Sequence, residues 1–156
     1  MANLNLNGNV SKNEEHLHKA YNDLIYFGKL FSPQDFLASD TPNFHHEVGK
    51  HLIDRSTQQL ALVLPRDHAK STLAACAVMH RFLFATKEAP EFICWVGEAQ
   101  DQARDNLAWI QNHVFENPAI HYYFGDLEGD KWTKDEFTLK NGCRMIGKGT
   151  SQRLRG

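Results

Sequence analysis

Apolar residues recur with helical spacing in some segments of this 156-residue chain and form short continuous runs in others. Helical spacing begins after Ser11, which a glutamate follows at capping-box distance, and continues from Leu17 to Phe27. Thr41 and Pro42 indicate a second helix start, an N-cap followed by proline at the first helical position. That helix is expected to end near Asp54.

Two continuous apolar runs, Leu60–Leu64 and Phe92–Val96, are typical of strands buried on both faces. Each run is followed by a segment with a helical pattern. The segment 71–84 is rich in alanine and leucine, and the segment 100–115 is amphipathic. Two strand–helix units in succession predict an α/β fold whose parallel strands are joined by right-handed crossovers.

A hairpin is predicted near the end of the chain, because Asn141 and Gly142 separate two strand-like segments between Phe137 and Ile146. The last ten residues are polar, basic and rich in glycine, with no closing element. Two parallel strands and a hairpin make a poor complete sheet, so we expect a fold that is incomplete at its C-terminus. We expect residues 1–40 to form an arm and helical extension and residues 41–156 to form the α/β domain.

The composition is that of a globular protein, with 42% hydrophobic and 23% charged residues. Its net charge of −2 provides no overall positive field, so any contact with DNA must be local. The three cysteines have no CxxC spacing, which favours free thiols in a reducing compartment. The first 12 residues are polar and the longest apolar runs hold about five residues, which predicts neither a signal peptide nor a membrane span.

The segment 64–72, between the first predicted strand and its helix, has the chemistry of a phosphate-binding loop. Such a loop needs converging backbone N–H groups, a lysine that reaches the β- and γ-phosphates, and a hydroxyl that holds Mg²⁺. Lys70 supplies the charge, Ser71 supplies the hydroxyl, and the following helix contributes its N-terminal dipole. Arg66 adds a guanidinium that can bridge γ-phosphate oxygens.

The loop departs from G-x-x-x-x-G-K-[ST], because Leu64 and Ala69 stand where that pattern has glycine. Alanine fits if the backbone there has near-helical dihedral angles, but it excludes a positive φ. The alternative interpretation is a solvated strand-to-helix turn whose lysine and serine only cap the helix. In that interpretation Arg66 forms a surface salt bridge, for example with Asp67.

The segment Pro65–Thr72 resembles the deviant Walker A loop of the large terminase subunits of tailed bacteriophages. Phe44–Val48 precedes the loop at about the distance of that family's adenine-binding segment, and His45 lies where the family often has an adenine-reading glutamine. A histidine can stack on a base or donate one hydrogen bond, but it cannot make the paired contacts of glutamine. Weaker similarity extends over residues 31–156. The resemblance implies a three-layer P-loop NTPase-type fold with a mostly parallel sheet flanked by helices.

The resemblance also implies a function and a set of roles. Lys70 would contact the β- and γ-phosphates of ATP, Ser71 would ligate Mg²⁺, and Arg66 would sense the γ-phosphate and couple hydrolysis to movement. Family members act as homo-oligomeric rings that drive double-stranded DNA into a procapsid, with the portal protein and the small terminase subunit as partners. The implied location is the host cytoplasm of an infected bacterial cell, docked on the procapsid. The nucleotide-binding set would be His45, Pro65, Arg66, Asp67, His68, Ala69, Lys70, Ser71 and Thr72.

The acidic Walker B strand is expected just after Gly156, and the family's C-terminal nuclease domain is absent as well. Without a carboxylate to hold Mg²⁺ and activate water, we expect this chain alone to bind nucleotide weakly and not to hydrolyse it. Two other functions stay open. One is a helicase- or recombinase-like P-loop ATPase, which usually keeps both loop glycines, and the other is a non-catalytic interaction module with a degenerate P-loop.

Overall fold

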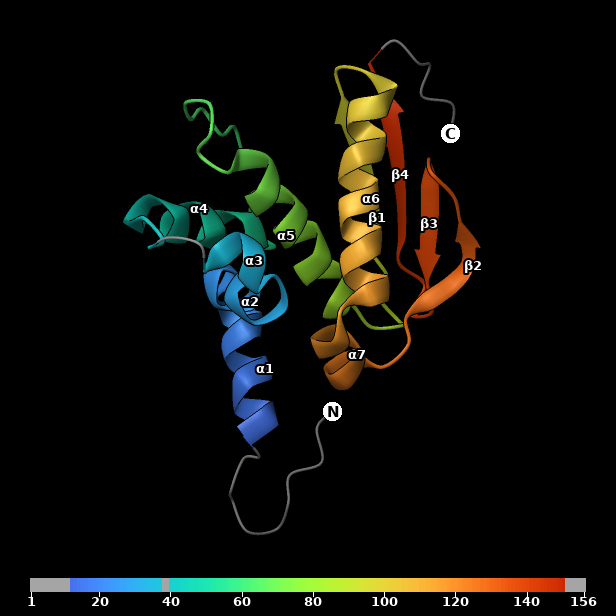
Figure 1. Ribbon diagram of the computed structural model, residues 1–156, viewed down its shortest axis with the longest axis horizontal. Coiled ribbons are helices and arrows are strands. Elements are labelled where there is room, and N and C mark those ends of the chain that lie inside the picture. Colours follow the sequence, from blue (N-terminus) through green and yellow to red (C-terminus); the bar gives the residue numbers. More distant parts are fainter. Residues whose placement is uncertain (1–11, 38–39, 151–156) are drawn as a thin grey trace.

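The computed structural model describes residues 12–37 and 40–150, which form an α/β fold with a four-stranded sheet. The short N-terminal helices and α4 gather on one side in Figure 1, the sheet lies on the other, and α5 and α6 run between them. The elements in chain order are α1 (Lys12–Asn22), α2 (Leu24–Phe31), α3 (Pro33–Phe36), α4 (Asn43–Ile53), α5 (Lys70–Leu83), β1 (Phe92–Gly97), α6 (Gln100–Glu116), α7 (Pro118–Phe124), β2 (Glu128–Trp132), β3 (Glu136–Leu139) and β4 (Arg144–Gly149).

The predicted N-terminal helix is present but divided. Asp23 adopts an extended conformation, and its carboxylate accepts hydrogen bonds from the N–H groups of Ile25 and Tyr26, so α2 starts anew after α1. The expected cap at Ser11 lies outside the described residues. The second start is shifted by one position, because Pro42 is the N-cap of α4 and not its first helical residue.

The sheet is mixed, and the prediction of a mostly parallel sheet is wrong. Its strand order is β1-β4-β3-β2; β1 pairs with β4 in parallel, while β3 pairs with both β4 and β2 in antiparallel fashion. The predicted hairpin at Asn141 and Gly142 is confirmed, and it makes β3 and β4 antiparallel because a tight turn reverses the chain. Gly142 has φ +89°, which glycine adopts without strain.

The predicted strand at Leu60–Leu64 does not form. Its hydrophobic run led to the prediction, but a strand also needs a neighbouring strand to satisfy its backbone N–H and C=O groups. None of the described strands pairs with this segment. Its side chains are not buried either, since Val63 is 93% exposed and Leu60 is 42% exposed. The segment therefore leads into α5 as irregular chain.

Helix α6 covers one face of the sheet (Figure 1). Gly147 of β4 lies so close to this helix that an added Cβ would be 3.0 Å from a methyl carbon of Leu107. On the other face of β1, Phe92, Cys94 and Val96 are exposed. The described residues thus do not form the three layers that the terminase resemblance implies.

The hydrophobic core joins the N-terminal helices to α5. Phe27 of α2 is fully buried, and its ring centroid lies 4.8 Å from that of Phe31 and 5.1 Å from that of His80 on α5. His80 is also buried, and its Nε2 lies 2.9 Å from the carbonyl oxygen of Tyr21. Its Nδ1 is buried without a hydrogen-bond partner among the described residues. The chain thus keeps a neutral histidine inside its core.

This burial predicts a pH dependence of stability. Burial lowers the pKa of His80 from an ordinary 6.5 to about 4. The unfolded chain therefore takes up a proton at higher pH than the folded chain does, so the stability conferred by neutral His80 is present above pH 6.5 and is lost as the pH falls toward 4. We expect His80→Gln to reduce this fall in the free energy of unfolding, measured by urea denaturation across that range. The same change at exposed His51 should leave the fall intact, and an unchanged slope in His80→Gln would contradict the assignment.

Candidate nucleotide-binding site

The loop before α5 lies at the free end of that helix, away from the sheet (Figure 1). The predicted helix after the loop is confirmed, with α5 starting at Lys70. Residues 66–72 line a hollow of about 540 Å³, so the loop segment predicted from the sequence forms a concave surface. The structure brings Arg66, Asp67, His68, Ala69, Lys70, Ser71 and Thr72 together there, and Pro65 adjoins them in the chain.

The backbone of the loop is shaped to present N–H groups. Asp67 has φ +62° and Ala69 has φ +53°, both in the left-handed region. Ala69 is the N-cap of α5 and has no side chain that could accept a hydrogen bond from the first turn. The N–H groups at the start of α5 therefore lack a side-chain acceptor, as in backbone concavities that bind anions.

The positive φ of Ala69 contradicts the expectation that alanine excludes a positive φ at this position. The left-handed conformation costs a residue with a Cβ about 1–2 kcal/mol, whereas glycine adopts it freely. The loop therefore has the shape that glycine usually supports, although alanine occupies the position. Asp67 tolerates the same region better, because its short polar side chain can form local hydrogen bonds.

We accordingly expect Ala69→Gly to raise the free energy of unfolding by about 1 kcal/mol, since the relief of strain exceeds the added entropy of the unfolded chain. The measurement is urea denaturation. Ala75, buried in the middle of α5, provides a control: the same substitution there should change the free energy of unfolding in the opposite direction. Ala75→Gly should lower stability by about 1 kcal/mol. A destabilised Ala69→Gly variant would contradict the strain at this position.

The ammonium group of Lys70 is held by the loop itself. Its Nζ donates a hydrogen bond to the carbonyl of Leu64, at 2.7 Å, and another to the carbonyl of Pro65. Sequence reasoning did not identify these two carbonyls as partners, because backbone acceptors leave no signature in side-chain identity. These hydrogen bonds keep the ammonium group of Lys70 beside the loop, where a bound anion can replace the two carbonyls as its acceptor.

Arg66 is exposed and forms no ion pair with the described residues. The surface salt bridge of the alternative interpretation, for which Asp67 was one possible partner, is therefore not formed within the described residues. This guanidinium, four residues before Lys70 and unpaired among the residues that the structure describes, adds a second positive charge to the hollow.

His45 lies on α4 and reaches the loop. Its Nε2 is 3.2 Å from the carbonyl oxygen of His68, and the Nδ1 of His68 is 2.7 Å from the carbonyl oxygen of Arg66. The ring of Phe44 lies 4.3 Å from the ring of His45 and 5.9 Å from that of His68, measured between centroids. The structure thus brings Phe44 and His45, from the segment that resembles the terminase adenine-binding segment, next to the loop.

A cavity of about 370 Å³ separates α4 from the start of α5. Its lining includes Phe44 and His45, and it shares four residues with the hollow at the loop: Asp67, His68, Ala69 and Thr72. The two spaces are therefore adjacent, and their sizes are those of small-molecule sites. One elongated ligand can place an anionic end at the loop and a planar end beside these rings.

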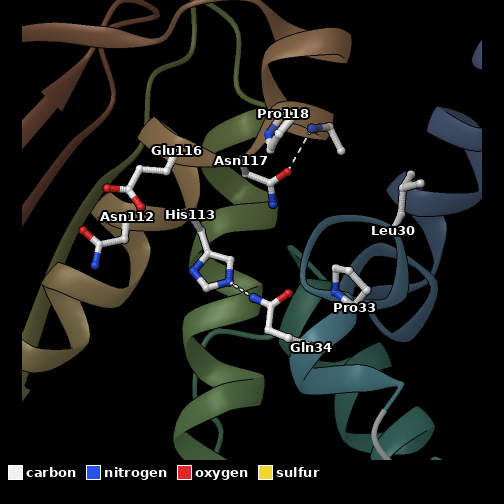
Figure 2. Close-up of a pocket in the computed structure, with 9 residues that line it drawn as sticks. Leu30, Pro33, Gln34, Asn112, His113, Glu116, Asn117 and Pro118 are labelled. Atoms are coloured by element: carbon white, nitrogen blue, oxygen red, sulfur yellow. Dashed lines mark hydrogen bonds between the residues drawn. The ribbon is translucent and has the colours of Figure 1, made fainter.

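Figure 2 shows another concavity, of about 500 Å³, between α2–α3 and the end of α6. His113 lies in it with its Nε2 2.6 Å from the amide nitrogen of Gln34, and the side chain of Asn117 caps α7 at its edge. This concavity shares no lining residue with the loop. Its contacts serve mainly to join the helices.

Ser71, whose hydroxyl is predicted to hold Mg²⁺, stands at the second position of α5 and lines the hollow. In residues 12–37 and 40–150, no group of three or more histidine, cysteine or acidic side chains is arranged to hold a metal ion. No helix of the described chain has the length and apolar character needed to cross a bilayer.

The chain has no match among protein-family models, curated proteins or solved structures.

Proposed function

We propose that this chain binds the phosphates of a nucleoside triphosphate at residues 65–72. The observation that carries the proposal is the combination at the start of α5. Two residues with positive φ shape the backbone, the helix start has no side-chain cap, and Arg66 and Lys70 supply positive charge. Free N–H groups, a helix N-terminus and fixed cations together form an anion site suited to phosphate.

The proposed ligand is Mg²⁺-ATP. Lys70 would exchange its contacts with the loop carbonyls for β- and γ-phosphate oxygens, Ser71 would hold Mg²⁺, and Arg66 would contact the γ-phosphate. The nucleoside would occupy the adjacent cavity, where Phe44 and His68 offer ring faces for stacking. Stacking on aromatic side chains accepts any base, so this arrangement alone selects weakly among nucleotides.

The resemblance of Pro65–Thr72 to terminase Walker A loops supports the proposal of a cellular role. In that role the chain is part of a homo-oligomeric ATPase ring that moves double-stranded DNA into a procapsid in the cytoplasm of an infected bacterium. The portal protein and the small terminase subunit would be its partners. Arg66 would transmit the state of the γ-phosphate to the moving parts of the ring.

A second candidate is a non-catalytic interaction module. The exposed side chains of Leu60, Val63, Phe92 and Val96 favour it, because exposed apolar surface often marks contact with other proteins. Nucleotide binding separates the two candidates, since the module needs no affinity for phosphate.

Calorimetric titration of the chain with Mg²⁺-ATP tests the proposal. We expect binding that weakens with added salt, because the site is built from cations and dipoles. Tripolyphosphate with Mg²⁺ should also bind, because most of the contacts go to phosphate. If the folded chain binds neither ligand, the loop is only a turn between two elements and the proposed function is wrong.

A further inference from the structure

His45 is the one predicted nucleotide-binding residue that lies outside the loop, and its contact in the structure is with the loop. The terminase resemblance implies that this position recognises the base. In the structure its Nε2 lies 3.2 Å from the carbonyl oxygen of His68. Because a carbonyl can only accept, the Nε2 of His45 carries the hydrogen and donates it. In the terminase family, a glutamine side-chain amide often reads the base at this position. In this chain the Nε2 of His45 instead donates its hydrogen to a backbone carbonyl of the loop.

The carbonyl that His45 holds lies between the two strained residues of the loop. His68 stands between Asp67 and Ala69, which both have positive φ. Its carbonyl belongs to the same planar peptide group as the N–H of Ala69, and in a trans peptide the C=O and N–H bonds point in opposite directions. When His45 draws the carbonyl toward α4, the N–H of Ala69 must point away from α4.

We propose that His45 is a positioning residue for the phosphate loop and not the residue that reads the base. Its hydrogen bond to the His68 carbonyl fixes the peptide group that joins His68 to Ala69, so that the N–H of Ala69 is oriented before the ligand arrives. This inference rests on the proposed function of the loop. It also links the position of α4 to phosphate binding, because a displacement of α4 would break the hydrogen bond between His45 and the His68 carbonyl.

Two variants of His45 separate positioning from base recognition. In His45→Gln the amide nitrogen can take the place of Nε2 and donate to the same carbonyl. In His45→Asn the amide nitrogen takes the place of Nδ1 and cannot reach the carbonyl. The matched control is His46→Asn on the next residue of α4, for which the described chain shows no contact with the loop. The ligands are Mg²⁺-ATP and Mg²⁺-tripolyphosphate, which has no base.

We expect His45→Asn to weaken the binding of both ligands by about three- to tenfold, the loss of one hydrogen bond, and by the same factor for each. His45→Gln should restore both affinities to within about twofold of the wild type. His46→Asn should change neither. Circular dichroism of each variant confirms that the fold is intact, and the rescue by glutamine excludes a general loss of structure.

Other results would overturn the inference. If His45→Asn weakens ATP binding and leaves tripolyphosphate binding unchanged, His45 reads the base and the loop does not depend on it. If neither affinity changes, the hydrogen bond has no role in binding. If the wild-type chain binds neither ligand, the proposed function itself fails, and this inference falls with it.

Discussion

Replacement of Lys70 by alanine is expected to lower the affinity of the chain for Mg²⁺-ATP and for Mg²⁺-tripolyphosphate by about 30-fold to a few thousand-fold. Loss of a charged partner from a hydrogen-bonded pair costs about 2–5 kcal/mol, and each 1.4 kcal/mol is tenfold in the dissociation constant. The stability of the fold should change little, because within the described part of the chain Lys70 donates only to the carbonyls of Leu64 and Pro65. Water can take over both acceptors in this exposed loop. Titration calorimetry measures the affinities, and urea denaturation measures the stability.

Lys50 provides the matched control for charge. It is exposed on α4 and lies outside both spaces at the loop. Lys50→Ala removes the same charge from the chain, so any general effect of net charge on anion binding appears in both variants. We expect its effect on affinity to stay within about twofold, as for a screened surface charge. Equal losses of affinity in the two variants would show that the ligands bind non-specifically to positive charges on the surface. The loop would then not be the binding site.

Replacement of Phe27 by alanine is expected to lower the free energy of unfolding by about 3–5 kcal/mol, the cost of removing a large aromatic side chain from a packed core. The ring is fully buried and packs against Phe31, His80 and Phe84. Phe27 lies on α2, whereas His80 lies on α5 and Phe84 is the C-cap of α5. The substitution should therefore also weaken the packing of α5, the helix that begins at the loop. Urea denaturation followed by circular dichroism measures the change.

Phe92 provides the matched control for Phe27. Its ring is 60% exposed on β1, so Phe92→Ala should cost less than about 1 kcal/mol. The shape of the Phe27→Ala transition also tests the expected division between residues 1–40 and 41–156. One cooperative transition would mean that the helical extension and the rest of the chain unfold together. Two separate transitions, with only the first shifted, would mean that the extension is an independent unit.

Local patterns were sufficient for most of the helices and for the hairpin. The spacing of apolar residues predicted α5 and α6 within one or two residues, and the Asn141-Gly142 pair predicted the turn between β3 and β4. A helix or a tight turn depends on residues close in sequence, so its conformational propensities and apolar spacing can be read from one short segment. The strand β2 had no such signal, because it is a short acidic edge strand that gains its conformation from pairing with β3.

The sequence also located the candidate site, since the loop chemistry depends on Lys70, Ser71 and Arg66 lying next to a helix start. It did not determine the conformation of that loop. The positive φ of Ala69 arises because the chain must turn from the segment after α4 into α5, and alanine by itself disfavours it. The same holds for the contact of His45 with the carbonyl of His68, which joins residues 23 positions apart.

By itself, then, the sequence determined most of the helical segments, the turn at Asn141-Gly142 and the position of the candidate loop. The tertiary structure decided that Leu60–Leu64 is not a strand, that the sheet is mixed, and that His45 contacts the loop backbone. The physical reason is the range of the interactions involved. Helix formation and turn geometry are satisfied within a few residues, whereas a strand exists only where another strand supplies its hydrogen bonds, and a loop conformation depends on what packs against it.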